Sequence, residues 1–249
     1  QEILADWFTG SPRDCTVEEG KMYFTKEFAP GYALAICKLE SGEKVMAEAG
    51  AMVTQDAHIK METSATNKKG IGGLLKGLGR AFLTGESFFR NTFTAQDAPG
   101  EVTFAPGLPG DILIHEMTGQ DLIIQQSAYM ASSTDVEIET KWGGFKGLIG
   151  QRNMFWIRAF GNGPLALNAF GAIKEIDVDG SFIVDTGHIV AFEPSLSFKI
   201  KRVGSWFSTF FSSEGFVCRF TGTGKLFIQT RNPSEFGSLV GPKLPPRNS

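Results

Sequence analysis

The feature that most constrains this chain is an internal repeat, in which one stretch of sequence returns twice. Tyr32–Met52 aligns without gaps with Pro109–Tyr129, and this first offset takes Gly42 to Gly119. A third copy follows at a second, shorter offset, which takes Leu122-Ile123-Ile124 to Phe182-Ile183-Val184. Repetition of this kind indicates supersecondary units that bury their apolar faces against one another.

The strand that follows each copy of the repeat shows period-two alternation. Apolar side chains recur at every second residue with polar residues between them, and the same two offsets relate the copies. This alternation is typical of an antiparallel strand with one face in the core and the other in water. The alternating pairs are Ile59 and Met61, Val136 and Ile138, and Leu196 and Phe198.

A Gly-x-Gly sequence follows the next, aromatic strand in two of the copies. Phe155–Arg158 precedes Gly161-Asn162-Gly163, and Phe216–Arg219 precedes Gly222-Thr223-Gly224. A phosphate-binding loop would need a helix after the glycines, and no helical pattern follows either of them. We therefore expect each Gly-x-Gly to form a hairpin turn between two strands.

These patterns predict an all-β fold of three repeated β-sandwich or double-stranded β-helix units in a pseudo-threefold arrangement. A unit of this size buries too little apolar area to be secure alone, so one compact domain over 1–249 is expected. Its predicted parts are repeat 1 over 20–108 with a Gly-rich insertion over 68–85, repeat 2 over 109–170, repeat 3 over 171–235, and a proline-containing disordered tail over 236–249.

Net charge and cysteine content limit the partners and the compartment. The formal net charge is −3 and the pI about 5.7, so no positive field collects nucleic acid and no such partner is expected. The three cysteines, Cys15, Cys37 and Cys218, lack CxxC spacing, which favours buried thiols in a reducing compartment. No apolar run is long enough to span a bilayer, so we expect a cytoplasmic protein, with peripheral contact to a membrane as an option.

The connections between the alternating and the aromatic strands carry more cations, glycines and large apolar side chains than turns require. They cover 68–89, 141–156 and 201–216. In the first one, apolar residues at steps of three and four indicate either a short basic amphipathic element or a flexible loop. The candidate surface residues are Lys68, Lys69, Leu74, Leu75, Lys76, Leu78, Arg80, Phe82, Lys141, Trp142, Phe145, Lys146, Lys201, Arg202, Trp206, Phe207 and Phe210.

Two interpretations of these connections stay open. In a threefold arrangement they emerge at one end of the body, as an apolar patch ringed by cations that suits an anionic membrane surface or a partner protein. Alternatively, side chains such as Trp142 and Trp206 pack against a neighbouring lobe or a second subunit of a homo-oligomer.

Residue patterns for catalysis or metal binding are missing from the sequence. His58, His115 and His188 lie at non-equivalent places without metal-ligand spacing, so surface or turn positions are expected for them. Arg90, Arg158 and Arg219 recur on the aromatic strands, where stacking or ion pairing is the expected role. We expect a protein that is not an enzyme and that binds no cofactor or metal.

Several motifs together resemble a known family. They are AEAGAM at 47–52, GESFF at 85–89, DTGHIVAFE at 185–193 and SEGFVCRFTGTGKLFIQTRNP at 213–233. Over nearly the whole chain they are similar to the altered-inheritance-of-mitochondria family of bacteria, archaea and fungal mitochondria. The resemblance implies a fold like that of the tryptophan RNA-binding attenuation protein, with three β-units per chain. It does not carry over RNA or tryptophan binding, because no edge rich in Lys and Arg can be matched.

The sequence therefore supports two functional hypotheses. The first is a non-enzymatic scaffold or interaction protein that oligomerises and docks to a membrane surface or partner through the connections. The second is a small-molecule binding module with its ligand in a cleft between β-units.

Overall fold

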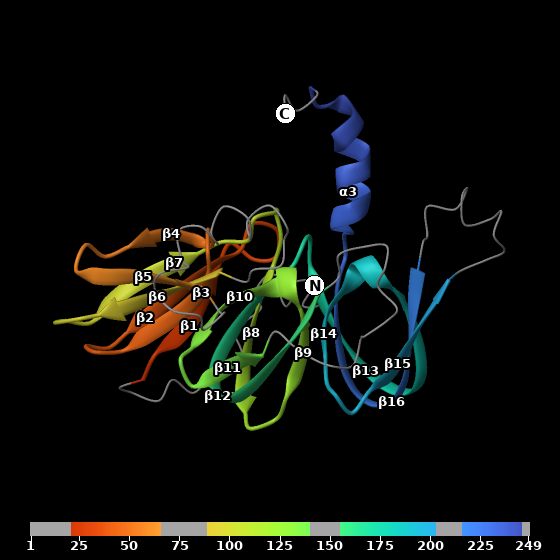
Figure 1. Cartoon of the computed structure of the whole chain (residues 1–249), viewed down its shortest axis with the longest axis horizontal. Helices are drawn as coiled ribbons and strands as arrows, with labels where there is room; N and C mark the ends of the chain where they lie inside the picture. The colour runs from red at the N-terminus through yellow and green to blue at the C-terminus, as the bar shows by residue number, and fades with distance from the viewer. Residues whose placement is uncertain (1–20, 66–88, 140–154, 203–215, 246–249) are drawn as a thin grey trace, which may run out of the picture.

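The chain folds almost entirely into antiparallel strands, which confirms the all-β prediction (Figure 1). The structure is a computed structural model that describes residues 21–65, 89–139, 155–202 and 216–245. Its strands are β1 Tyr23–Glu27, β2 Leu34–Leu39, β3 Lys44–Glu48, β4 Met52–Gln55, β5 Ile59–Ala65, β6 Phe89–Ala95, β7 Gly100–Phe104, β8 Ile112–Thr118, β9 Leu122–Gln125, β10 Tyr129–Ser133, β11 Val136–Glu139, β12 Trp156–Asn168, β13 Ile173–Asp185, β14 Ile189–Phe192, β15 Ser197–Arg202 and β16 Phe216–Gln229.

The strands lie in three neighbouring groups along the long axis of the molecule. Figure 1 shows β1–β7 at one end, β8–β12 in the middle and β13–β16 at the other end. We call these the first, second and third strand groups. A four-stranded sheet has the order β1-β2-β7-β4, and a twelve-stranded sheet follows β13-β16-β14-β9-β12-β10-β3-β6-β5, with β8 and β11 beside β12 and β15 beside β16.

Three of the strands are much longer than the others, and two of them, β12 and β16, pass through a predicted turn without reversing. The first part of β12 pairs with β9 and β11, and its last part pairs with β8 and β10. In β16 the first part pairs with β15 and the last part with β14, while β13 pairs along nearly the whole length. In the first group two shorter strands, β6 and β7, together pair with four strands in the same way. β6 pairs with β3 and β5, and β7 pairs with β2 and β4.

The predicted Gly-x-Gly hairpin turns are therefore wrong. Gly161 and Gly163 lie inside β12 with φ angles of +111° and +114°, and Gly222 lies inside β16 with φ of +120°. At Gly161 a Cβ atom would stand 2.2 Å from the Asp135 carbonyl oxygen. These glycines let one strand bend and change partners, because no other residue fits that backbone conformation and close approach.

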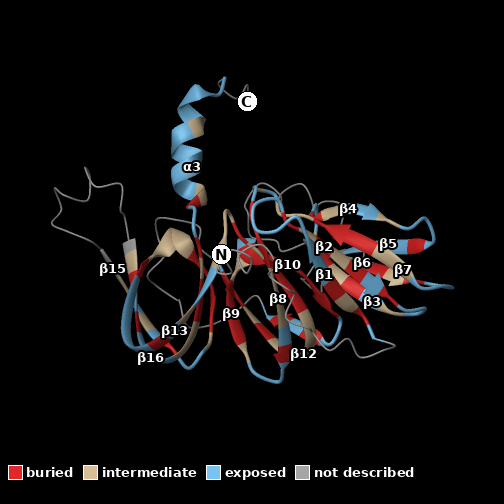
Figure 2. Ribbon diagram, turned by 180° about the vertical axis from the view of Figure 1, so that it is seen from behind, coloured by how far each residue is buried: buried red, intermediate tan, exposed pale blue. Residues whose placement is uncertain are grey.

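The core consists of three apolar clusters, and the clusters also contain side chains from a neighbouring strand group. Met130 and Ala131 of β10 are buried in the cluster formed mainly by the first group. Val190 and Ala191 of β14 are buried in the cluster of the second group. Figure 2 shows buried segments on the strands from one end of the molecule to the other. Because each cluster is completed by its neighbour, the groups are packed as one body.

Two strand pairs join the groups. β10 pairs with β3 in the register Ala131↔Ala47, and β14 pairs with β9 in the register Ala191↔Ile124. These ladders make the twelve-stranded sheet continuous from the third group to the first.

The expected disordered tail over 236–249 is partly wrong. Pro233–Val240 form helix α3, and Gly241–Lys243 form a 3-10 turn. Asn232 caps the helix, since its side chain accepts a hydrogen bond from the Ser234 N–H at 3.0 Å, and the ring of Phe236 meets that of Phe170 at 5.3 Å. The prolines that favoured a disordered tail, Pro242, Pro245 and Pro246, all follow Val240, where the helix ends, and Pro233 sits in the first turn, where a helix tolerates it. Figure 2 shows α3 projecting from the strands with most of its surface exposed.

The described cysteines behave as expected. Cys37 and Cys218 are both buried and unpaired by disulfides. Burial raises the pKa of the Cys218 thiol to about 12 and that of Cys37 further, with nearby Glu43 adding to the effect at Cys37. Both thiols therefore stay protonated and act as small apolar core side chains. Cys15 lies outside the described residues.

Candidate interaction surfaces

The predicted basic and apolar surface falls almost wholly outside the described residues. Lys201 and Arg202 are the exceptions, because their backbone forms the end of β15 and pairs with Val217 and Phe216. The other candidates are Lys68, Lys69, Leu74, Leu75, Lys76, Leu78, Arg80, Phe82, Lys141, Trp142, Phe145, Lys146, Trp206, Phe207 and Phe210. Whether they form one surface stays a prediction.

The structure does fix the strands between which each connection runs. The first connection joins β5 and β6, which pair up to Ala65↔Phe89, and the third joins β15 and β16, which pair up to Arg202↔Phe216. The second joins β11 and β12, with Glu139 opposite Arg158. Each connection thus links two strands that pair with each other, as the loop of a hairpin does.

A second kind of candidate surface is the open edge of β4. This strand pairs with β7 on one side, and the described part of the chain holds no strand on its other side. Val53 is 52% exposed and Thr54 is also exposed. The strand ends the four-stranded sheet, and an open strand edge beside an apolar side chain is a combination that templates strand addition.

A further open edge with exposed apolar side chains belongs to the second half of β13. Residues 181–185 pair with β16, and within the described ranges no strand lies on their other side. Ile183 is 60% exposed and Phe182 is 37% exposed. Figure 1 places β4 and β13 in opposite end groups of the molecule.

Sequence reasoning missed these edges. Their only signal was positional, because in the predicted repeat β4 falls in the first copy and β13 in the last. A strand at the end of a repeat array lacks the neighbour that covers its equivalents.

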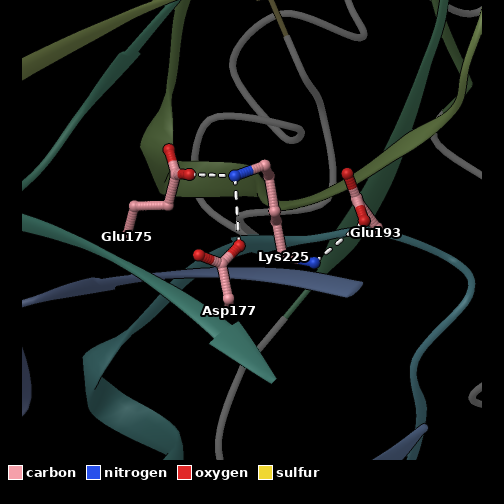
Figure 3. A network of polar contacts seen from close by, with 4 residues as sticks. All are labelled: Glu175, Asp177, Glu193 and Lys225. Atoms are coloured by element: carbon pink, nitrogen blue, oxygen red, sulfur yellow. Dashed lines mark hydrogen bonds and ion pairs between the residues drawn. The ribbon is translucent and has the colours of Figure 1, made fainter. Parts of the chain in front are cut away.

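An ion-pair network lies on the third strand group (Figure 3). Lys225 on β16 contacts the carboxylates of Glu175 and Asp177 on β13, the latter at 3.2 Å between Nζ and Oδ1. The backbone N–H of Lys225 also donates to Glu193 Oε2 at 2.8 Å. The hydrogen bond to Glu175, then that to Asp177, raises the pKa of Lys225. This network fastens β16 between β13 and the turn after β14, which is a structural role.

Arginine pairing on the aromatic strand agrees with the prediction at Arg158. Its Nε donates to Asp121 Oδ2 at 2.8 Å, its Nη1 lies 3.3 Å from Glu139 Oε2, and its guanidinium stands 4.8 Å from the Phe160 ring centroid. These contacts satisfy the cation and tie β12 to its neighbours.

The histidines lie apart from one another, as expected, but one of them is not a surface residue. His58 is exposed, with Nε2 3.1 Å from the Pro99 carbonyl oxygen, and His188 lies in a 3-10 turn with Nδ1 2.8 Å from the Gln229 carbonyl oxygen. His115 is half-buried against Phe227, and burial lowers its pKa. In the described part of the chain no His, Cys, Asp and Glu side chains gather into a group that could hold a metal ion.

A half-buried carboxyl stands beside the joint between the first and second groups. Glu48 ends β3 and faces Arg90 in the β3–β6 register. Burial raises its pKa to about 7. Tyr129, which is fully buried, donates to the Met46 carbonyl oxygen at 3.3 Å, and its own pKa is raised by burial.

These observations define an all-β protein whose open strand edges include β4 and residues 181–185 of β13, both with exposed apolar side chains. The chain belongs to the family Mitochondrial biogenesis AIM24, whose pattern matches residues 26–231. The resemblance drawn from the sequence motifs is thereby confirmed. Within the described residues, no helix is both long and apolar enough to cross a membrane.

Two streptococcal proteins are similar to this chain over most of their length. The uncharacterised protein M6_Spy0233 of Streptococcus pyogenes serotype M6 is 28% identical over 237 residues, which cover 94% of this chain and 95% of the relative. The crystal structure of protein SPYM3_0169 from Streptococcus pyogenes superposes with a TM-score of 0.73 at 27% identity, covering 90% of this chain and all of that one. Neither name states an activity.

Proposed function

We propose that this protein is a non-enzymatic scaffold, built from three copies of one β-unit, that self-associates and docks to anionic membrane surfaces through its three connections. The three strand groups are the three copies. The matching division of strand partners among β6 with β7, β12 and β16 is the observation that carries the proposal.

Repetition supplies such a protein with several membrane-binding loops on one body. Each copy has one connection between its edge strand, β5, β11 or β15, and the aromatic strand paired with it, and each connection contains cations and large apolar side chains. A single loop of this kind binds anionic headgroups weakly, at about 1 kcal/mol per Lys or Arg near the surface. Several loops held by one rigid body bind far more tightly, because after the first contact the others act at high effective concentration.

Sedimentation with vesicles tests the docking. Wild-type protein is expected to sediment with vesicles of phosphatidylserine and phosphatidylcholine but not with phosphatidylcholine alone. The variant Lys69→Glu/Lys76→Glu/Arg80→Glu is expected to lose this binding because it reverses the charge of the first connection.

A matched control separates this surface from overall charge. Lys44→Glu/Lys60→Glu/Lys174→Glu changes the net charge by the same amount at exposed strand positions and is expected to keep binding. Absence of wild-type binding, or equal loss in both variants, would contradict membrane docking through the connections. Self-association is tested separately by the native mass of the full chain, which is 27.1 kDa as a monomer.

A further inference from the structure

The two open edges correspond to strands that are covered elsewhere in the same chain. By the first and second offsets of the repeat, β4 corresponds to β10 and β14, and residues 181–185 of β13 correspond to β9 and β3. β10 pairs with β3 of the preceding group, and β14 pairs with β9 of the preceding group. In the part of the chain that the structure describes, β4 and 181–185 alone lack this partner.

The two joints inside the chain use one register. Ala131 lies opposite Ala47 at the first joint, and Ala191 lies opposite Ile124 at the second. Ala131 aligns with Ala191 by the second offset, and Ala47 aligns with Ile124 by the first. Applying the same offsets once more places Thr54 opposite Val184 and Gln55 opposite Ile183.

Burial differs between covered and open copies of the same position. The bulge in the β4-type strand falls at Val53, Met130 and Val190, where the register with the neighbouring strand shifts. Met130 and Val190 are fully buried in the core cluster of the preceding group, whereas Val53 is 52% exposed. An apolar side chain that is buried at two equivalent joints and exposed at a third position marks a joint that lacks its partner.

The open side of β13 shows the same contrast. Ile123 is fully buried at the joint between the second and third groups, whereas its counterpart Ile183 is 60% exposed. Leu122 is likewise buried, and its counterpart Phe182 is 37% exposed. The third core cluster thus has an uncovered flank of the kind that Met130 and Val190 cover in the other two.

The edges of β5, β11 and β15 do not share this contrast. β5, β11 and β15 are each paired on one side by described residues, in all three groups alike. Those edges are a regular outer boundary of the unit. The β4 and β13 edges also lack the Lys or Pro that natural edge strands use against pairing, and the bulge at Val53 does not prevent it, because β10 and β14 pair while carrying the same bulge.

We propose that β4 of one copy of this chain pairs antiparallel with residues 181–185 of β13 of a second copy, with Thr54 opposite Val184 and Gln55 opposite Ile183. The inference rests on the three-unit organisation proposed above and names the partner in its self-association. The joint is head-to-tail, since it uses different surfaces on the two copies. Such joints generate a closed ring or an open filament, according to the rotation at each step.

Charge substitutions on the edges test the pairing directly. Wild-type protein is expected to have a native mass at a multiple of 27.1 kDa by light scattering after gel filtration. Val53→Lys and Ile183→Lys are each expected to be monomeric. An equimolar mixture of the two is expected to form a dimer and nothing larger, because each variant keeps one intact edge and these edges are complementary.

The fold and the charge have their own controls. Val53 and Ile183 are exposed in the isolated chain, so both variants are expected to unfold at the same temperature as a wild-type chain diluted to monomer. Leu239→Lys introduces the same charge at a side chain that is 66% exposed on α3, and it is expected to leave the native mass unchanged.

Cross-linking tests the register. In a Cys15→Ser background, Gln55→Cys/Ile183→Cys is expected to form disulfide-linked multimers on mild oxidation, since directly opposed residues lie within bonding distance. Gln55→Cys/Ser181→Cys is displaced by two residues, about 7 Å along the strand, and is expected not to cross-link.

The outcomes separate this inference from the proposed function. A wild-type protein that is monomeric at every concentration overturns both the inference and the proposed self-association. An oligomer that survives both Lys substitutions, or that cross-links only in the displaced register, overturns the inference and leaves self-association through another surface.

Discussion

At the scale of single residues, backbone conformation and burial decide what a position can hold. Gly161 has a positive φ and no space for a Cβ atom, whereas Gly42 has a φ of +87° with no atom within 4 Å of such a Cβ. The pair therefore separates two costs of replacing glycine, the conformational one and the steric one.

Gly161→Ala is expected to destabilise the protein much more than Gly42→Ala. At Gly42 the cost is the left-handed backbone alone, about 1 kcal/mol. At Gly161 the new methyl group also collides with the Asp135 carbonyl, 2.2 Å away, so a loss of about 3 kcal/mol or more is expected. Urea unfolding of both variants measures the difference, and equal losses would show that β12 yields at this bend.

Glu48 makes stability depend on pH in an unusual direction. Its carboxyl pKa is raised by burial from 4.5 to about 7, so the folded state favours the protonated form. The contribution of Glu48 to the free energy of unfolding is fully present below its pKa in the unfolded state. It is lost as the pH rises through its pKa in the folded state. Glu48→Gln stays neutral, so relative to wild type it is expected to gain on the order of 1–3 kcal/mol between about pH 4.5 and 7 and to hold the gain above that.

The measurement is the free energy of unfolding of Glu48→Gln and wild type from pH 4 to 8. Glu137→Gln, an exposed glutamate on β11, is the control and is expected to show no such rise. A difference that stays flat across this range would mean that water reaches the Glu48 carboxylate in the folded state.

At the scale of elements, α3 is the part with the weakest support. It is eight residues long with no buried side chain, so its own hydrogen bonds are marginal in water. Its stability comes from the Asn232 cap and from the contact of Phe236 with Phe170.

Asn232→Ala is expected to release α3 from the strands. The substitution removes the cap at the Ser234 N–H, which costs about 1 kcal/mol, a large part of what holds so short a helix. Amide hydrogen exchange of 233–240 is expected to approach the unprotected rate while the strands keep their protection. Ser238→Ala, within the same helix and exposed, is the control that should leave exchange nearly unchanged.

The strands were predictable from the sequence where one face meets water. β5, β11 and β15 lie where the alternation placed them, because a half-buried strand must alternate. The Gly-x-Gly bends were misread, since a glycine with positive φ serves a hairpin turn and a bent strand equally well. Only the partners on both sides of the glycines, such as β11 before Gly161 and β8 after Gly163, tell the two apart.

At the scale of the whole molecule, exposure depends on neighbours rather than on local sequence. Phe182-Ile183-Val184 and Leu122-Ile123-Ile124 are equally apolar, and both form strands. The second run is buried because β14 lies beside it, and the first is largely exposed in the isolated chain. No local pattern distinguishes them, so the open edges could be found only once the order of strands was known.

The same dependence predicts how the groups share stability. Met130 belongs to β10 but is buried in the first group's core, so Met130→Ala is expected to lower the free energy of unfolding by about 2–5 kcal/mol. Val53→Ala, at the equivalent exposed position, is expected to change it by less than about 0.5 kcal/mol in dilute, monomeric protein. Urea unfolding followed by both fluorescence and circular dichroism should give one coincident transition for Met130→Ala, because the first and second groups lose the same contact together. Separate transitions would instead mean that each group folds alone, and that the joints between groups add little to stability.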